Sequence, residues 1–284
     1  MHLISRHHRT LRPAARRLFA FILAACAAAG GVSFLLSRHA AVPSASAASA
    51  SSTEAEIAPA SGAASAAEEE PGLLSAQQAQ AMLDDPRMVL VNHTNKMPED
   101  YTFTTRECGS ATAVNKTLQT EAADAFFAMQ AAAAKEGVTI WMQSGYRSVK
   151  YQEGLYNKKT QYYLDKGLSR AEALQKAASI VNPPGYSEHN CGLAADLNSP
   201  EHTGLDTGFE KTAAFHWLKA HAVEYGFILR YPKDAEAVTE ITYEPWHWRY
   251  VGPENAALIQ QSGLCLEDAV ALLQKLAAGE STAG

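Results

Sequence analysis

The most informative stretch of the sequence is Ser187-Glu188-His189-Asn190-Cys191-Gly192-Leu193-Ala194-Ala195-Asp196. Its second half has the composition of a short buried strand, yet it ends on a carboxylate. A carboxylate without partners among apolar side chains is very costly, so Asp196 needs a cation or several hydrogen-bond donors. His189 precedes it by seven residues, and Gly192 between them lets the chain turn sharply. The stretch therefore predicts two ligands of one metal ion.

A third ligand is expected from the run Glu244-Pro245-Trp246-His247-Trp248-Arg249. Two imidazoles and one carboxylate, with the fourth position left to water, form a catalytic zinc arrangement, so His247 completes the set. Glu244 would act as the general base that takes the proton of the water. Residues three apart in a regular strand face opposite ways, so we expect an irregular backbone around Pro245, which cannot donate a ladder hydrogen bond.

The other histidines add nothing to this site. His216 and His221 lie five apart on an expected helix and therefore point to different faces. The sequence contains no His-Glu-x-x-His motif, which excludes the common helical zinc-peptidase pattern. A single histidine in an apolar run is usually a hydrogen-bonded core residue, so the hypothesis depends on His189, Asp196 and His247 acting together.

Charge argues against a nucleic-acid-binding protein. The chain has 24 Lys+Arg and 30 Asp+Glu, a net charge of -6. Six arginines and no acidic residue precede position 39, which leaves 18 basic against 30 acidic residues, or -12, for the remainder. A body this acidic would repel a phosphate backbone.

The N-terminal region predicts export. Residues 18–36 are 19 positions without a charge, which as a helix would span about 28 Å, close to the bilayer core. Five arginines precede them, so we expect residues 1–39 to be a cytoplasmic segment and an uncleaved single-pass membrane anchor, with the catalytic domain outside the cytoplasm. The alternatives are a secreted protein, cleaved near Ala45-Ser46-Ala47, and a lipoprotein modified at Cys26.

The rest of the chain is expected to contain one folded domain. Residues 40–73 are mostly Ala, Ser, Glu and Pro, which predicts a disordered linker. Residues 74–278 form the domain and 279–284 a tail. Helices are expected at 75–83, 117–136, 149–165, 169–180 and 211–225, with two closing helices that start at 253 and 266. Besides the buried strand in the second half of residues 187–196, strands are expected at 88–92, 138–143, 227–231, 238–243 and 246–251, the last three as a meander. Helices and adjacent strands without a βαβ rhythm predict an α+β fold.

Several ordered motifs together resemble the VanY-type zinc D-alanyl-D-alanine carboxypeptidases, whose relatives include LD-carboxypeptidases. The motifs are Ser144-Gly145-Tyr146-Arg147-Ser148, Gln152, Ser187-Glu188-His189 with Gly192, Ala194 and Asp196, and Glu244-Pro245-Trp246-His247 with Arg249-Tyr250-Val251-Gly252. The similarity extends over roughly residues 90–263. It implies a small antiparallel sheet flanked by helices, the zinc peptidase fold that Hedgehog-type and DD-peptidase domains share.

The resemblance also implies roles for individual residues. His189, Asp196 and His247 would bind Zn²⁺, and Glu244 would be the general base. Arg147 would steady a charge on the substrate or the oxyanion. The expected substrate contacts are Gln152, Ser187, Tyr231 and Trp246.

The implied activity is removal of the C-terminal D-alanine from peptidoglycan stem peptides, at either a D-Ala-D-Ala or an L,D bond. Two alternatives stay open: an endopeptidase that cuts inside the wall peptide, and a non-catalytic zinc-bearing domain that binds wall peptides or a protein partner. The sequence predicts no oligomeric state.

Cys191 departs from the family pattern, in which a small polar residue such as Thr is expected. A thiolate near zinc could interfere, so Cys191 is expected to point away from the metal or to be oxidised. Outside the cytoplasm, Cys108, Cys191 and Cys265 allow one internal bridge, and we expect Cys191 to take part in it.

Overall fold

The computed structural model describes residues 74–280. The predicted anchor (1–39), the predicted linker (40–73) and most of the predicted tail (279–284) lie outside the described residues. Between residues 74 and 280 no single helix is long and apolar enough to cross a membrane. The helices α9 (Pro253–Ser262) and α10 (Leu266–Ala277) would reach that length only as a pair bent by 99°.

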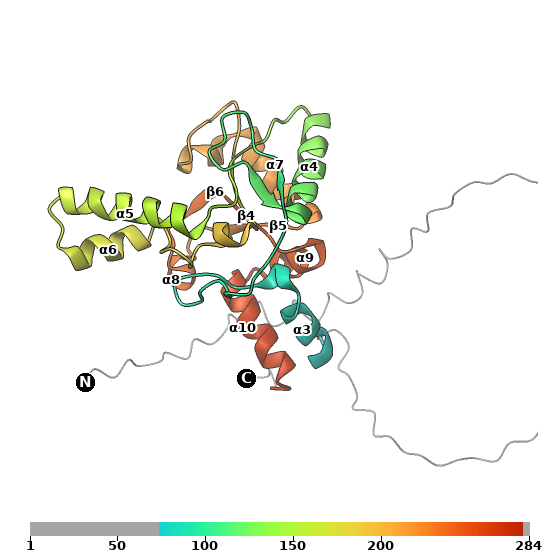
Figure 1. Ribbon diagram of the computed structural model, residues 1–284. Coiled ribbons are helices and arrows are strands. Elements are labelled where there is room, and N and C mark those ends of the chain that lie inside the picture. Colours follow the sequence, from blue (N-terminus) through green and yellow to red (C-terminus); the bar gives the residue numbers. More distant parts are fainter. Residues whose placement is uncertain (1–73, 281–284) are drawn as a thin grey trace, which may run out of the picture.

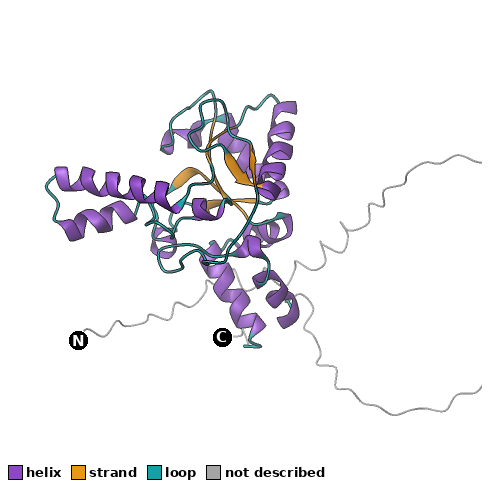
Figure 2. Ribbon diagram, in the orientation of Figure 1, coloured by secondary structure: helices purple, strands orange, loops and turns teal. Residues whose placement is uncertain are grey.

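An antiparallel sheet of four strands occupies the centre of the domain, with helices around it (Figure 2). Its strand order is β3 (Trp141–Ser144), β4 (Ala194–Asn198), β6 (Glu244–Tyr250) and β5 (Phe227–Tyr231). A second sheet pairs β1 (Thr105–Glu107) with β2 (Thr117–Gln119). These small antiparallel sheets among helices confirm the predicted α+β class.

Side chains on the two faces of the central sheet serve different purposes, because successive residues of a strand point in opposite directions. Ala195, Leu197, Trp248 and Tyr250 belong to the main apolar core, which also contains Phe126 and Met129 of α4. The residues between them in β4 and β6 point to the other face, where a second core joins α3, α9 and α10. The polar residues of the candidate site lie on this second face.

Helices surround the sheet on several sides (Figure 1). α10 packs against α3, far away in the sequence, and α9 packs against β5. The helices are α3 (Ala76–Leu83), α4 (Thr120–Lys135), α5 (Val149–Asp165), α6 (Arg170–Ala178), α7 (Ala213–His221), α8 (Glu236–Thr239), α9 (Pro253–Ser262) and α10 (Leu266–Ala277). Short 3₁₀ turns are η2 (Pro86–Met88), η3 (Glu188–Cys191), η4 (Thr207–Lys211) and η5 (Ala222–Tyr225).

Helices α5 and α6 pack against each other and project from the body as an arm (Figure 1). Ser148 caps α5 through a hydrogen bond from the backbone N–H of Tyr151 to its side chain. Ser169 and Glu172 form a capping box at the start of α6, in which each side chain accepts a hydrogen bond from the backbone N–H of the other residue. The start of α5 joins the arm to the candidate site.

Two predicted strands are wrong. Residues 88–92 were expected to be extended, but Pro86 and the side chain of Asp85 start the turn η2 instead. The carbonyls of Arg87 and Val89 then accept hydrogen bonds from Arg249 rather than from a neighbouring strand. Residues 238–243 were expected to form the middle strand of a meander. Their β-branched side chains suggested a strand, but Thr239 bonds back to the carbonyl of Ala235 and ends the short helix α8.

The remaining differences concern the ends of elements. The helix predicted from residue 117 begins at Thr120, because residues 117–119 pair with β1. Strand β3 begins at Trp141 rather than at residue 138. The helix expected at 211–225 is divided among η4, α7 and η5. Strands β5 and β6 pair directly, so the expected three-stranded meander is a two-stranded pair.

The predicted disulfide at Cys191 is also wrong. Cys108, Cys191 and Cys265 are all free thiols. The Cys191 thiol is fully buried and donates a hydrogen bond to the carbonyl of Glu188, and burial raises its pKa to about 11. A neutral thiol with its own acceptor does not compete for a metal, which agrees with the expectation that Cys191 points away from the site.

Gly192 sets the turn between η3 and β4. Its φ of 69° lies in the left-handed region, and a Cβ there would meet Phe103 Cε2 at 3.0 Å and Gln119 Cγ at 3.2 Å. We expect Gly192→Ala to lower the free energy of unfolding by about 1–2 kcal/mol for the backbone and by about 1–3 kcal/mol more for the crowding. Gly167→Ala is the matched control, because Gly167 has a φ of 88° and nothing within 4 Å of the added Cβ. Urea unfolding that gave equal losses for the two variants would contradict the crowding.

Candidate metal centre

Strand pairing brings Asp196 and His247 together. They are direct cross-strand partners in β4 and β6, so their side chains leave the same face of the sheet. The distance from His247 Nδ1 to Asp196 Oδ1 is 3.3 Å. Both residues are buried, 5% exposed for His247 and 3% for Asp196.

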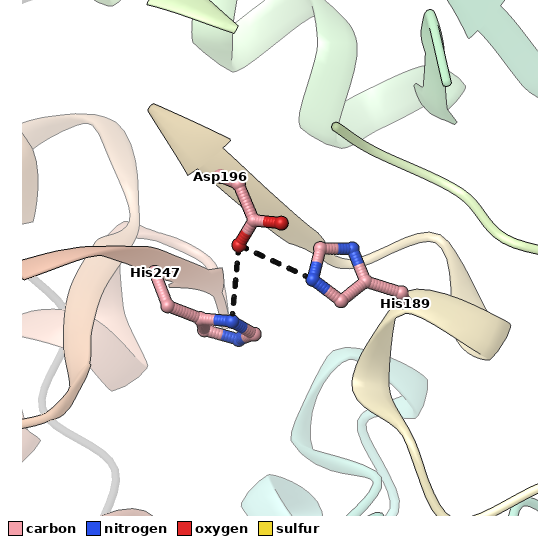
Figure 3. Close-up of side chains that lie close together, drawn as sticks. All are labelled: His189, Asp196 and His247. Atoms are coloured by element: carbon pink, nitrogen blue, oxygen red, sulfur yellow. Dashed lines mark ion pairs between the residues drawn. The ribbon is translucent and has the colours of Figure 1, made fainter. Parts of the chain in front are cut away.

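His189 reaches the same oxygen from η3, the turn before β4. Its Nε2 lies 3.3 Å from Asp196 Oδ1, and its Nδ1 lies 2.7 Å from the carbonyl oxygen of Gly145. A Cβ at Gly145 would collide with the carbonyl oxygen of Thr117, so only glycine allows the backbone at residue 145 to lie this close to the backbone of Thr117. Figure 3 shows the two imidazoles converging on one oxygen of Asp196, each from a different segment of the chain.

The three side chains have the geometry of a zinc site. One ligand atom of each residue lies within 4.8 Å of the other two. Zinc bonds of about 2.0–2.2 Å in a tetrahedral arrangement place neighbouring ligand atoms roughly 3.3–3.5 Å apart, which agrees with the 3.3 Å from Asp196 Oδ1 to each imidazole nitrogen. Asp196 Oδ1 is buried and has no hydrogen-bond partner among residues 74–280. A cation would satisfy this oxygen, so the residues present fit zinc.

Electrostatics at the centre also favour a cation. Burial alone would raise the pKa of Asp196, but His189 and Arg147 outweigh it and hold the pKa well below its usual range. Burial, followed by the charge of Arg147, lowers the pKa of His189 to about 4. Asp196 is therefore ionised and His189 neutral at pH 7, as metal ligands must be. Burial lowers the pKa of His247, but Asp196 and Glu188 outweigh burial and raise it to about 9, so a metal ion would have to displace a proton from His247.

Glu244 lies beside the three residues at the start of β6. Its Oε2 is 3.6 Å from His247 Nδ1, and the residue is 7% exposed. Burial, together with the charge of Asp196, raises the pKa of Glu244 to about 8 against the opposing charges of His247 and Arg147. A dication bound nearby would favour the ionised form.

The predicted irregularity around Pro245 is confirmed. Tyr231 pairs with Glu244 and Leu229 pairs with Trp248, so one residue of β5 stands opposite three of β6. The Trp248 indole N–H donates to the carbonyl of Pro245 across the bulge at 3.0 Å. This extra length turns Glu244 and His247, three residues apart, toward one site.

Arg147 lies in the same site, after β3 and before α5. It donates through Nη2 to Asp196 Oδ2 and through Nε to Ser144 Oγ at 3.0 Å. No acceptor for its Nη1 lies within hydrogen-bonding distance among residues 74–280. The guanidinium thus binds the carboxylate of Asp196 and still keeps donors for a further oxygen.

A cleft of about 380 Å³ opens above the three residues and follows α5 toward Tyr162. The four expected substrate contacts all line this cleft: Gln152, Ser187, Tyr231 and Trp246. Gln152 is buried and donates to the carbonyl of Asn182 at 2.7 Å, so its amide orients the cleft wall. The Tyr231 ring lies 4.7 Å from the His247 ring. Lys158 and Lys159 add positive charge along the α5 wall.

A buried ion-pair group that was not expected from the sequence lies beneath His247 and consists of Glu188, Arg230 and Arg249. Their exposed fractions are 0% for Glu188, 1% for Arg230 and 0% for Arg249. Arg230 is the one charged residue of the apolar strand Phe227–Tyr231, which is the pattern that could have indicated a buried charge.

Comparisons with known proteins agree with this geometry. A family model described as VanY, D-alanyl-D-alanine carboxypeptidase, matches residues 115–253. A D-alanyl-D-alanine carboxypeptidase of Enterococcus faecalis is 34% identical over 200 residues, which are 70% of this chain and 71% of that protein. The family match spans all the residues of the centre, from Arg147 to His247.

Two solved structures share the fold. The first is a mutant of the vancomycin resistance D,D-pentapeptidase VanY in complex with Zn(II). The superposed region covers 65% of this chain and 99% of the VanY chain, with a TM-score of 0.57 and 32% sequence identity. The second is the LdcB LD-carboxypeptidase, solved to explain peptidoglycan recognition. The superposed region covers 66% of this chain and 87% of the LdcB chain, with a TM-score of 0.56 and 34% sequence identity.

Proposed function

The chain belongs to the VanY family of D-alanyl-D-alanine carboxypeptidases, and on this basis we propose that it is a zinc-dependent enzyme that removes the C-terminal D-alanine from peptidoglycan stem peptides. The observation that carries the proposal is the convergence of His189 and His247 on Asp196 Oδ1, with Glu244 at 3.6 Å from His247. Three ligands with an adjacent free carboxylate are what metal-assisted hydrolysis of a peptide bond requires.

Different residues of the cleft would carry out different parts of the reaction. Zinc, when bound, would lower the pKa of a water molecule and polarise the scissile carbonyl. Glu244 accepts a proton from the attacking water while the water oxygen bonds to the carbonyl carbon. Glu244 then gives the proton to the leaving amine as the C–N bond breaks. Arg147, anchored on Asp196 and Ser144, presents Nη1 to the terminal carboxylate of the substrate.

Two other functions remain as alternatives. An endopeptidase would use the same centre without reading the free carboxylate. A non-catalytic wall-peptide or partner-binding domain would keep the metal without the base. Glu244 lies at the metal centre and Arg147 keeps free donors, which favours the carboxypeptidase.

Product analysis tests the proposed function. Defined wall pentapeptide and tetrapeptide are incubated with the zinc-loaded protein, and the products are identified by mass spectrometry. Loss of a single alanine from the pentapeptide is expected for cleavage of the D-Ala-D-Ala bond, and loss of one alanine from the tetrapeptide for cleavage of the L,D bond. Fragments cut inside either peptide would replace the proposal with the endopeptidase, and unchanged peptides would favour the binding domain.

We also propose that residues 18–36 anchor the enzyme in the membrane with the catalytic domain on the outer side. The motivation is the charge-free stretch after five arginines. The N-terminal sequence of the protein purified from membranes checks this proposal. A mature chain that begins after residue 40 would show that the stretch is removed.

A further inference from the structure

We propose that Glu188 is a positioning residue of the metal centre, which holds the proton of His247 on Nε2 and so presents Nδ1 to the metal. The inference rests on the proposed zinc site. It assigns a function to the residue before His189, which has no place in the reaction described above.

Two buried atoms without partners face each other at this point. Glu188 Oε2 and His247 Nε2 are 3.5 Å apart. Both are buried, and neither has a hydrogen-bond partner among residues 74–280. His247 Nδ1 lies 3.3 Å from Asp196 Oδ1, and the proposed zinc ion would bind both atoms, so a neutral zinc-bound His247 ring would carry its proton on Nε2. The carboxylate oxygen is the acceptor toward which that proton points.

The other oxygen of Glu188 fixes the direction of the carboxylate. Oε1 accepts hydrogen bonds from Arg230 Nε at 2.7 Å and from Arg249 Nη1 at 2.8 Å. All three side chains are 0% exposed. With Oε1 held by two guanidinium groups from β5 and β6, the remaining oxygen can only face His247.

The charges of this group balance, which allows it to be buried. Arg230 also binds Glu267, the second residue of α10, with Nη1 lying 2.9 Å from Glu267 Oε2. Arg249 donates through Nη2 to the carbonyls of Arg87 and Val89. Two arginines thus meet two carboxylates, so Glu188 keeps its negative charge in the interior. Glu267 contacts Arg230 and not His247, so the Arg230–Glu267 ion pair joins the group to α10 without touching the imidazole.

The two histidines of the centre therefore face different acceptors. His189 Nδ1 lies 2.7 Å from a backbone carbonyl oxygen, that of Gly145, whereas His247 Nε2 lies 3.5 Å from a carboxylate oxygen of Glu188. An outer carboxylate fixes the tautomer of a metal-binding imidazole and makes it a stronger ligand. We therefore expect the carboxylate of Glu188 to fix the ring orientation and tautomer of His247 more strongly than the carbonyl of Gly145 fixes those of His189.

The test compares Glu188→Gln with Glu267→Gln. Both remove one carboxylate charge from the same ion-pair group, but only Glu188 faces His247. Zinc affinity is measured by competition with a chromophoric chelator, and stability by thermal unfolding. Glu188→Gln is expected to weaken zinc binding about 10- to 100-fold. Glu267→Gln should lower the melting temperature and leave zinc affinity unchanged. Equal affinity in Glu188→Gln and the wild type, or an equal loss in both variants, would overturn the proposal.

A second measurement needs no substitution and stays decisive if Glu188→Gln does not fold. In a long-range ¹H–¹⁵N spectrum of the zinc-loaded wild type, His247 should carry a proton on Nε2 that is protected from exchange, with the metal on Nδ1. Metal on Nε2 would overturn the role of Glu188 while leaving the zinc enzyme intact. A wild type that binds no zinc in the chelator assay would instead refute the proposed function itself.

Discussion

Replacing Glu244 with Gln is expected to lower kcat by about 10²- to 10⁴-fold, the usual contribution of a general base, while zinc remains bound. Gln has the size and shape of Glu but cannot take a proton from water. Asp196 Oδ1 lies 3.3 Å from one nitrogen of each imidazole, and Glu244 Oε2 lies 3.6 Å from His247 Nδ1, which is why Asp196 is the proposed ligand and Glu244 the proposed base. Metal content and hydrolysis are measured on the same preparation.

Glu240→Gln is the control for this variant. Glu240 lies four residues before Glu244, its side chain is 59% exposed, and it pairs with His93 rather than with the metal residues. It should keep wild-type activity, because a charge at the surface is screened from the cleft. Full activity in Glu244→Gln would remove Glu244 from the mechanism, and loss of zinc in that variant would make it a ligand.

Amidation of the C-terminus of the substrate is expected to slow cleavage about 10- to 150-fold. A charge-assisted hydrogen bond contributes roughly 1.5–3 kcal/mol, and each 1.4 kcal/mol corresponds to about a tenfold change. The free Nη1 of Arg147 would form this bond with the terminal carboxylate. In Arg147→Ala the ratio of rates for free and amidated peptides should fall toward unity.

The ion pair between Arg147 and Asp196 makes a metal measurement necessary in this experiment. Arg147→Lys keeps a positive charge beside Asp196 but lacks the planar fork, so it separates charge from geometry. If Arg147 variants lose rate equally on free and amidated peptides while zinc stays bound, the guanidinium acts on the oxyanion. If the wild type cleaves the free and the amidated peptide at the same rate, the proposed recognition of the terminal carboxylate is wrong. The endopeptidase function would then replace the carboxypeptidase proposal.

The sequence indicated which residues come together at the proposed centre better than it indicated the surrounding structure, because these residues lie in short motifs. His189, Gly192 and Asp196 belong to one stretch, and Pro245 marked the bulge between Glu244 and His247. What joins the two motifs is the β4–β6 register, in which Asp196 pairs with His247. Register depends on contacts between distant residues, so spacing along the chain does not reveal it.

Long-range hydrogen bonds explain the predictions that failed. Residues 88–92 look like a strand by composition, but Arg249 takes the carbonyls of Arg87 and Val89. Glu188 gave no indication beyond its place next to His189, since its partners Arg230 and Arg249 come from strands more than forty residues away, with separations of 42 and 61. A buried ion pair is recognised only when both members are known to meet.

The most direct test of the central claim is zinc content and hydrolysis measured together in the wild type and in Asp196→Asn. We expect about one zinc ion per wild-type chain, and activity that disappears on chelation and returns when zinc is added. Asp196→Asn should bind little metal and show little activity, because a neutral amide is a much poorer zinc ligand than a carboxylate. A wild type that hydrolyses the peptide equally well after complete removal of zinc, or an Asp196→Asn variant that holds zinc as tightly as the wild type, would contradict the account.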